Sequence, residues 1–192
     1  MIRILRLDRA ITKEELTYFQ KEALDGFCVF NPDNRRLQKE VSTAHPLVSS
    51  LIDLLSKHGL MRGREIGGVV AMHSLKGCRK QEWHTDYEVE PGKTRRKKAI
   101  GVLLALETPT FLETPETKYE LSAGDVICFE EDVVHAGAAY SRKSNTRLHM
   151  YLDVAGAPRA LDQNKTWLVK LTRAPKLANR AGIGKRPNPS RS

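Results

Sequence analysis

Apolar residues recur at helical spacing in two early segments. The pattern predicts a helix over residues 13–24, KEELTYFQKEAL, because its apolar side chains fall on one face. Thr12 and Glu15 match the S/T-x-x-E capping box that often begins a helix. A second helix is predicted from Pro46 to His58, where leucines follow at helical spacing. The N-terminal part should therefore form a helical layer.

The pattern changes from Ile66 onward, where short apolar or alternating runs recur between Gly, Pro and Asp turn signals. These runs are IGGVVAM, EWHTDYEV, AIGVLLAL, TFLET, KYEL, DVICF and RLHMYLDV. Such spacing is typical of a barrel or double-sheet sandwich. Shorter strands are expected at IRIL and FCVF, the latter followed by an NPDN turn, and TWLVKL should close the core as a strand or helix. The expected fold is α+β, mainly β, with the helices packed on one sheet of a jelly-roll-like core.

The length of 192 residues predicts a single domain over residues 1–173. Within it, the helical layer should occupy about residues 1–60 and the β core about 66–155. No apolar run reaches the roughly 20 residues that a membrane span needs. The three cysteines are too few and too widely spaced for a disulfide framework or a C-x-x-C zinc motif. We therefore expect an intracellular, cytoplasmic or nuclear, protein with no membrane partner.

Positive charge is concentrated at the C-terminal end. Residues 163–192 contain eight Lys and Arg and no acid, whereas residues 1–162 contain 24 basic and 23 acidic residues. Residues 174–192 are expected to form a basic flexible tail, and a second basic run, residues 93–98, should be a loop. Nucleic acid or another polyanion is a candidate partner for both, and a merely solvated surface is the alternative.

The most specific candidate site is His84-Thr85-Asp86 together with the distant His135. Side chains two residues apart on a strand point to the same face, so His84 and Asp86 should project together. Two imidazoles and one carboxylate on one side of a metal leave adjacent positions open, as in non-haem Fe(II) oxygenases. The alternative is a hydrogen-bonded surface pair and an unrelated histidine. A shared ion requires the imidazoles of His84 and His135 to lie within about 6 Å of each other.

Arg147 follows His135 by 12 residues, within RLHMYLDV. A strand there would carry its guanidinium into the same barrel, where an unpaired buried charge is costly. The planar guanidinium suits a carboxylate in a bidentate arrangement. The order H-x-D, H, R therefore predicts a metal site with a carboxylate anchor.

The chain resembles the Fe(II)/2-oxoglutarate-dependent dioxygenases, in particular the phytanoyl-CoA-hydroxylase-like and prolyl-hydroxylase-like branches. The resemblance rests on His84-Thr85-Asp86, His135 and Arg147, and on GDVICFEEDVVHAG before and around the second histidine. It implies a double-stranded β-helix (cupin-like) in which His84, Asp86 and His135 hold Fe(II) and Arg147 pairs with the distal carboxylate of 2-oxoglutarate. With O2, such an enzyme hydroxylates a substrate C–H bond and converts 2-oxoglutarate to succinate.

Two positions depart from the family pattern. Before H-x-D, where relatives often carry a Tyr or Asn that assists the cosubstrate, this chain has Met72, His73 and Ser74. Two residues after the arginine, where some relatives have a Ser, it has His149. The second 2-oxoglutarate-binding residue is therefore unassigned, as is the substrate, which is expected to be anionic or macromolecular. The alternatives are a non-enzymatic cupin-like module that binds a polyanion and a metalloenzyme in which Arg147 binds the carboxylate of the substrate.

Overall fold

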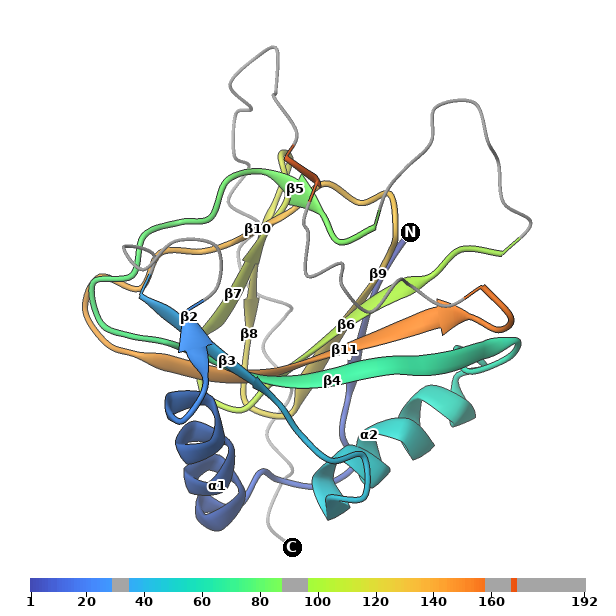
Figure 1. Cartoon of the computed structure of the whole chain (residues 1–192), viewed down its shortest axis with the longest axis horizontal. Coiled ribbons are helices and arrows are strands. Elements are labelled where there is room, and N and C mark those ends of the chain that lie inside the picture. Colours follow the sequence, from blue (N-terminus) through green and yellow to red (C-terminus); the bar gives the residue numbers. More distant parts are fainter. Residues whose placement is uncertain (29–34, 88–96, 158–166, 169–192) are drawn as a thin grey trace, which may run out of the picture.

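Both expected helices are present, and they lie against one face of a large antiparallel sheet (Figure 1). The computed structural model describes residues 1–28, 35–87, 97–157 and 167–168. Helix α1 spans Lys13–Leu24 and α2 spans Pro46–Lys57. The strands are β1 (Ile2–Arg6), β2 (Phe27–Cys28), β3 (Arg36–Glu40), β4 (Arg64–Ser74), β5 (His84–Thr85), β6 (Ile100–Ala105), β7 (Thr110–Glu113), β8 (Lys118–Leu121), β9 (Asp125–Glu130), β10 (Ala136–Gly137), β11 (Asn145–Val154) and β12 (Trp167–Leu168).

The large sheet has seven strands in the order β1-β9-β6-β11-β4-β3-β2. A three-stranded sheet, β10-β7-β8, and a two-stranded pair, β12-β5, form the remainder of the described β structure. All of these pairings are antiparallel. The fold is therefore α+β and mainly β, as the hydrophobic pattern predicts.

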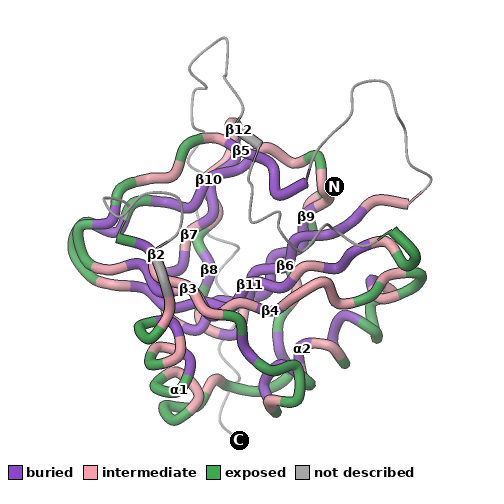
Figure 2. Tube along the Cα trace, viewed as in Figure 1, coloured by how far each residue is buried: buried purple, intermediate pink, exposed green. Residues whose placement is uncertain are grey.

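Two apolar clusters lie on opposite faces of the large sheet. The larger cluster joins the buried sides of α1 and α2 to one face, and includes Leu148 and Met150 of β11. The smaller one joins Leu103 and Ile127 of the large sheet to Leu112 of the small sheet. Figure 2 shows the resulting buried band through the middle of the sheet. Because side chains alternate along a strand, Arg147 and His149 of β11 face the side away from the helices.

The structure also differs from the sequence-based expectations. Strand β3, which pairs with β4, was not expected. Within the described part of the run EWHTDYEV, residues 82–87, the strand covers only His84–Thr85, so Asp86 lies just beyond the strand end. Residues 29–34, which include the expected turn, lie outside the described residues. Among the helices of the described ranges, none has the length and apolar composition needed to cross a bilayer.

Candidate metal centre

His84 and His135 are placed side by side by their own backbones. The amide of His84 donates to the carbonyl of His135 at 3.0 Å, and the amide of His135 donates to the carbonyl of His84 at 2.8 Å. Residues directly opposite in an antiparallel pair present their side chains on the same face. The two imidazole centroids are accordingly 4.5 Å apart, within the separation that a shared ion requires.

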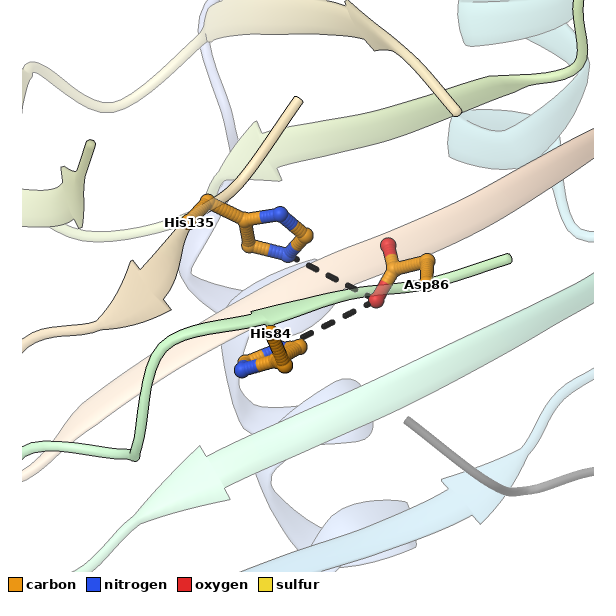
Figure 3. A group of neighbouring side chains, drawn as sticks. All are labelled: His84, Asp86 and His135. Carbon is orange, nitrogen blue, oxygen red and sulfur yellow. Dashed lines mark ion pairs between the residues drawn. The ribbon is translucent and has the colours of Figure 1, made fainter. Parts of the chain in front are cut away.

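Asp86 completes a compact group with these two histidines (Figure 3). One ligand atom from each of His84, Asp86 and His135 lies within 4.8 Å of the other two, and all three residues are buried. Asp86 Oδ1 is 3.9 Å from Nε2 of His84 and 3.5 Å from Nε2 of His135. The expected convergence of these three residues is therefore present, although Asp86 reaches the site from beyond the end of β5.

The remaining nitrogen of each imidazole is held by the backbone. His84 Nδ1 lies 2.7 Å from the carbonyl oxygen of Glu82, and His135 Nδ1 lies 3.0 Å from that of Val133. A carbonyl oxygen only accepts hydrogen bonds, so Nδ1 carries the proton in both neutral rings. Both Nε2 lone pairs are thereby directed to the space beside Asp86, as in metal sites whose histidines are oriented by a second hydrogen bond.

The electrostatics of the group centre on Asp86. Burial alone would raise the pKa of Asp86, but the charges of His135 and His149 and the hydrogen bond with His135 outweigh burial and leave this pKa below its usual value. Burial opposes protonation of His135, yet Asp86 dominates and raises the pKa of His135. The pKa of His84 is lowered, first by burial and then by His135. Asp86 is therefore an ionised carboxylate whose neighbours are the imidazoles of His84, His135 and His149.

A divalent cation fits this donor set. Asp86 Oδ2 is buried and accepts no hydrogen bond from the described residues, although His149 Nε2 lies 3.4 Å away. A buried carboxylate oxygen without a donor is costly unless a cation meets it. Once a cation displaces any proton from Nε2, the two imidazole nitrogens and one carboxylate would supply it with three protein ligands.

Arg147 lies on the same face of β11 as His149, two residues away. Its side chain is 2% exposed, and its Nη1 donates to Ser74 Oγ at 2.9 Å. Among the described residues this is its one hydrogen bond, and no ion pair with a carboxylate is present. Two residues along a strand span about 6.6 Å. Arg147 therefore lies about 6.6 Å along β11 from His149, whose side chain contacts Asp86.

Sequence reasoning missed Arg36, which lies 1% exposed on β3 and donates to Ser74 Oγ at 2.9 Å. His149, which stands where some relatives have a Ser, lies beside the group, with its Nε2 3.4 Å from Asp86 Oδ2. His73 lies on the opposite face of β4, where its Nδ1 is 2.9 Å from Thr146 Oγ1. No local motif marks Arg36, because its partners are remote in the sequence.

The basic segments are only partly described. Lys98, at the end of the basic loop 93–98, forms ion pairs with Asp132 at 2.6 Å and Glu130 at 3.4 Å. Residues 93–96 and the tail 174–192 lie outside the described residues. Their contribution to binding a polyanion remains a prediction.

Comparison with known proteins shows similarity in structure but not in sequence. No protein-family model matches the chain, and no curated protein matches it. The viral collagen prolyl hydroxylase vCPH from Paramecium Bursaria Chlorella virus-1, solved as a 2OG complex, aligns with a TM-score of 0.60 and 12% identity. The alignment covers 80% of this chain and 96% of that one.

Other solved structures give the same result. HygX from Streptomyces hygroscopicus, with nickel and 2-oxoglutarate bound, aligns with a TM-score of 0.57 and 10% identity over 88% of this chain and 91% of its own. A Pseudomonas putida prolyl-4-hydroxylase aligns with a TM-score of 0.56 and 11% identity, over 79% and 91%. This chain therefore has the fold of the Fe(II)/2-oxoglutarate-dependent oxygenases.

Proposed function

We propose that this protein is a non-haem Fe(II)/2-oxoglutarate-dependent dioxygenase that hydroxylates a C–H bond of its substrate, built on a double-stranded β-helix. The observation that supports this most is the group of His84, Asp86 and His135, whose ligand atoms lie within 4.8 Å of one another. Two histidines and one carboxylate with open positions are typical of non-haem Fe(II) oxygenases. The shared fold with oxygenases solved with 2-oxoglutarate supports the choice of cosubstrate.

Each residue then has a defined task. His84, Asp86 and His135 would hold Fe(II), with the imidazoles fixed by the carbonyls of Glu82 and Val133. Bound there, Fe(II) would supply the reaction in which O2 and 2-oxoglutarate give succinate, CO2 and a hydroxylated substrate. Arg147 would bind the distal carboxylate and so orient the 2-oxo acid end toward the metal. Burial of the four side chains excludes bulk water and strengthens these interactions.

Binding measurements test this proposal before the substrate is known. We expect metal-free protein to bind Mn(II), and the Mn(II) form to bind 2-oxoglutarate, in calorimetric titrations. Asp86→Ala and His135→Ala should abolish metal binding, whereas Arg147→Ala should retain Mn(II) and lose most 2-oxoglutarate affinity. His58→Ala, at an exposed helix end, is the matched control and should behave as wild type.

The outcomes separate the candidate functions. Unchanged Mn(II) affinity in Asp86→Ala would overturn the ligand assignment. Binding of Mn(II) without 2-oxoglutarate would favour a metalloenzyme whose substrate carboxylate meets Arg147. Succinate release that depends on Fe(II), measured over a panel of small metabolites, peptides and oligonucleotides, would then identify the substrate. The basic segments 93–98 and 174–192 are proposed to attract an anionic or macromolecular substrate.

A further inference from the structure

His84 and His135 lie at one end of a short antiparallel ribbon, which we define as residues 77–84 and 135–140. Three backbone pairs hold the ribbon together: His84 with His135, Gln81 with Gly137, and Cys78 with Tyr140. The spacing of these pairs is unequal on the two strands, so the ribbon is not a regular ladder. Between the last two pairs, the carbonyls of Arg79 and Ala138 therefore have no backbone donor among the described residues.

A guanidinium from the large sheet meets these carbonyls. Nη2 of Arg36, on β3, donates to the carbonyls of Arg79 and Gly137, each at 3.0 Å, and to that of Ala138. Its Nη1 donates to Ser74 Oγ at 2.9 Å, which fixes the group from β4. A guanidinium carries five donors in a rigid fork and no acceptor, so it can pair with several carbonyls at once. Arg36 thus supplies hydrogen bonds that the irregular ladder lacks, and it supplies them to both strands.

The guanidinium of Arg36 is both buried and charged. Its side chain is 1% exposed, and among the described residues it forms no ion pair with a carboxylate. Burial, and then the charge of Arg147, lower the pKa of Arg36 to about 10, so the group is still charged at neutral pH. Hydrogen bonds from a charged donor are stronger than those between neutral groups. Loss of this donor would leave the carbonyl of the buried Ala138 unpaired, which is costly.

The contact between Arg36 and the ribbon leaves no room for a side chain at Gly137. A Cβ atom at Gly137 would lie 3.0 Å from Nη1 of Arg36 and 2.3 Å from Oε1 of Gln81. That same Oε1 accepts a hydrogen bond from the Gly137 amide at 3.0 Å, which holds it in place. Glycine permits such a close approach to the backbone. The residue at position 137 therefore fits the guanidinium, and this observation is independent of the hydrogen bonds of Arg36.

The register of the ribbon determines whether the two histidines can share an ion. Strands β5 and β10 cover only two residues each, so few ladder bonds hold them. A slip of one residue turns every side chain of a strand to the opposite face. Because Arg36 donates to carbonyls of both strands, a slip of either strand would break its hydrogen bonds.

We propose that Arg36 is a positioning residue for the candidate metal centre. From the large sheet it fixes the register of the ribbon, and so it holds the imidazoles of His84 and His135 on one face with their centroids 4.5 Å apart. The metal rests on the proposed function, whereas the tie between Arg36 and the ribbon rests on geometry alone. Arg36 acts through the backbone of the ribbon and is not itself a ligand.

Calorimetric titration of the metal-free protein with Mn(II) tests this role. Arg36→Met keeps an apolar stem and removes every donor. We expect it to weaken Mn(II) binding by about tenfold or more, as for the loss of other groups that orient metal ligands. The sign is informative, because removal of a nearby positive charge would by itself strengthen the binding of a cation. A loss of affinity therefore reports lost positioning and not lost charge.

Arg64→Met is the matched control. Arg64 also donates to carbonyls, those of Lys98 at 2.8 Å and Leu60 at 3.0 Å, but it lies at the end of β4 opposite Ser74. Its loss should lower the free energy of unfolding and leave Mn(II) affinity within about twofold of wild type. The visible absorption bands of bound Co(II) depend on ligand geometry, so Arg36→Met should change these bands and Arg64→Met should not.

Gly137→Ala disturbs the same contact from the ribbon, and it keeps the proposal testable if Arg36→Met does not fold. The added methyl group would displace the guanidinium from its carbonyls and should also weaken Mn(II) binding. Because both changes disrupt one contact, the double variant should bind Mn(II) little more weakly than Arg36→Met alone. Losses that multiply in the double variant would show independent effects and overturn the shared contact.

The failures are distinguishable. Mn(II) affinity in Arg36→Met that equals or exceeds that of wild type would overturn the assignment of Arg36, as would an equal loss in Arg64→Met. Wild-type protein that binds Mn(II) and no 2-oxoglutarate would overturn the proposed function and leave the role of Arg36 in metal binding intact. Wild-type protein that binds no Mn(II) would overturn both.

Discussion

At the residue scale, His149 is the side chain most able to tune the candidate metal centre without belonging to it. Its Nε2 lies 3.4 Å from Asp86 Oδ2, and its ring stacks on Phe129 with the centroids 6.1 Å apart. Substitution of groups that orient a metal ligand typically costs 10–100-fold in metal affinity. We therefore expect His149→Phe, which keeps an aromatic ring beside Phe129, to weaken Mn(II) binding by about tenfold or more, as measured by calorimetry.

His73→Phe is the matched control for this substitution. His73 is also a buried histidine on the large sheet, but it pairs with Thr146 on the face turned toward the helices. Its loss should lower the free energy of unfolding and leave Mn(II) affinity unchanged. Equal Mn(II) affinities in His149→Phe and wild type would show that His149 does not orient Asp86.

Residue types alone predict the candidate site only in part. The spacing H-x-D marks His84 and Asp86 because both come from one short segment, and the apolar run before His135 marks the third residue. Arg36 carries no such signal, and Ser74 is marked only as one of three residues that stand where relatives often carry a Tyr or Asn. Their relation depends on the register between β3 and β4, which is set by pairing between remote segments.

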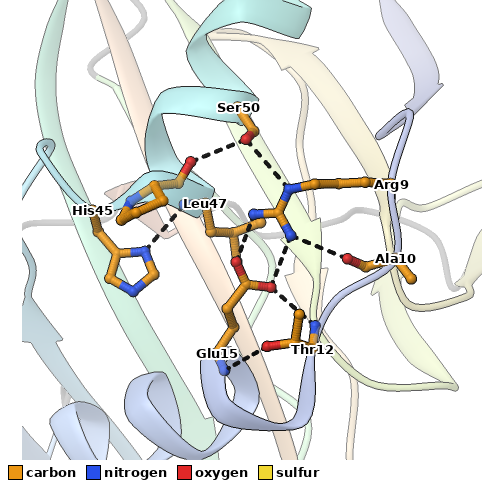
Figure 4. A network of polar contacts seen from close by, with 8 residues as sticks. Arg9, Ala10, Thr12, Glu15, His45, Leu47 and Ser50 are labelled. Carbon is orange, nitrogen blue, oxygen red and sulfur yellow. Dashed lines mark hydrogen bonds and ion pairs between the residues drawn. The ribbon is translucent and has the colours of Figure 1, made fainter.

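At the element scale, the start of α1 is a testable unit, and Arg9 links it to Ser50 of α2 (Figure 4). The Glu15 amide donates to Thr12 Oγ1 at 3.1 Å, and the Thr12 amide donates to Glu15 Oε2 at 2.9 Å. Arg9 Nη1 also donates to Glu15 Oε2, at 2.9 Å. Loss of such a cap costs about 1 kcal/mol. Thr12→Ala should therefore lower the free energy of unfolding in urea by about 1 kcal/mol.

Thr17→Ala provides the comparison within the same helix. Thr17 is exposed, and its hydroxyl donates to the carbonyl of Lys13 inside the helix. Alanine has the higher helix propensity, so this variant should be neutral or slightly stabilising. A loss in Thr12→Ala no larger than that in Thr17→Ala would mean that the capping box does not stabilise α1.

The elements differ in how well local pattern predicts them. Both helices and the long strands follow from apolar spacing, because one side of each contacts a continuous core. Strand β3, with the sequence RLQKE, has a single apolar residue and is a strand because it pairs with β4. Among the described residues of its run, 82–87, the strand at His84 covers only two, and its described partners, β12 and His135, each pair with it over only one or two residues.

At the scale of the whole molecule, the candidate site exists only when the chain is folded. The sheet order β1-β9-β6-β11-β4-β3-β2 joins the first strand to the middle of the chain and places β11 beside β4. Arg36, Ser74 and Arg147 come from three of these strands, and His84 and His135 from segments facing them. The apolar pattern contains no information on this order, so the meeting of Arg36 and Ser74 with Arg147 could not be predicted from it.

This dependence links metal binding to global stability. A ligand that binds only the folded state raises the free energy of unfolding by about 2.7 kcal/mol at 100 times its dissociation constant. Mn(II) should therefore stabilise the wild-type protein by about that amount in urea unfolding, and a chelator should reverse the effect. Thr12→Ala should show the same increment, because no described contact joins the start of α1 to the metal group and distant effects add. Asp86→Asn should show none. An increment that persists in Asp86→Asn would place the bound Mn(II) elsewhere in the protein and contradict the proposed ligands.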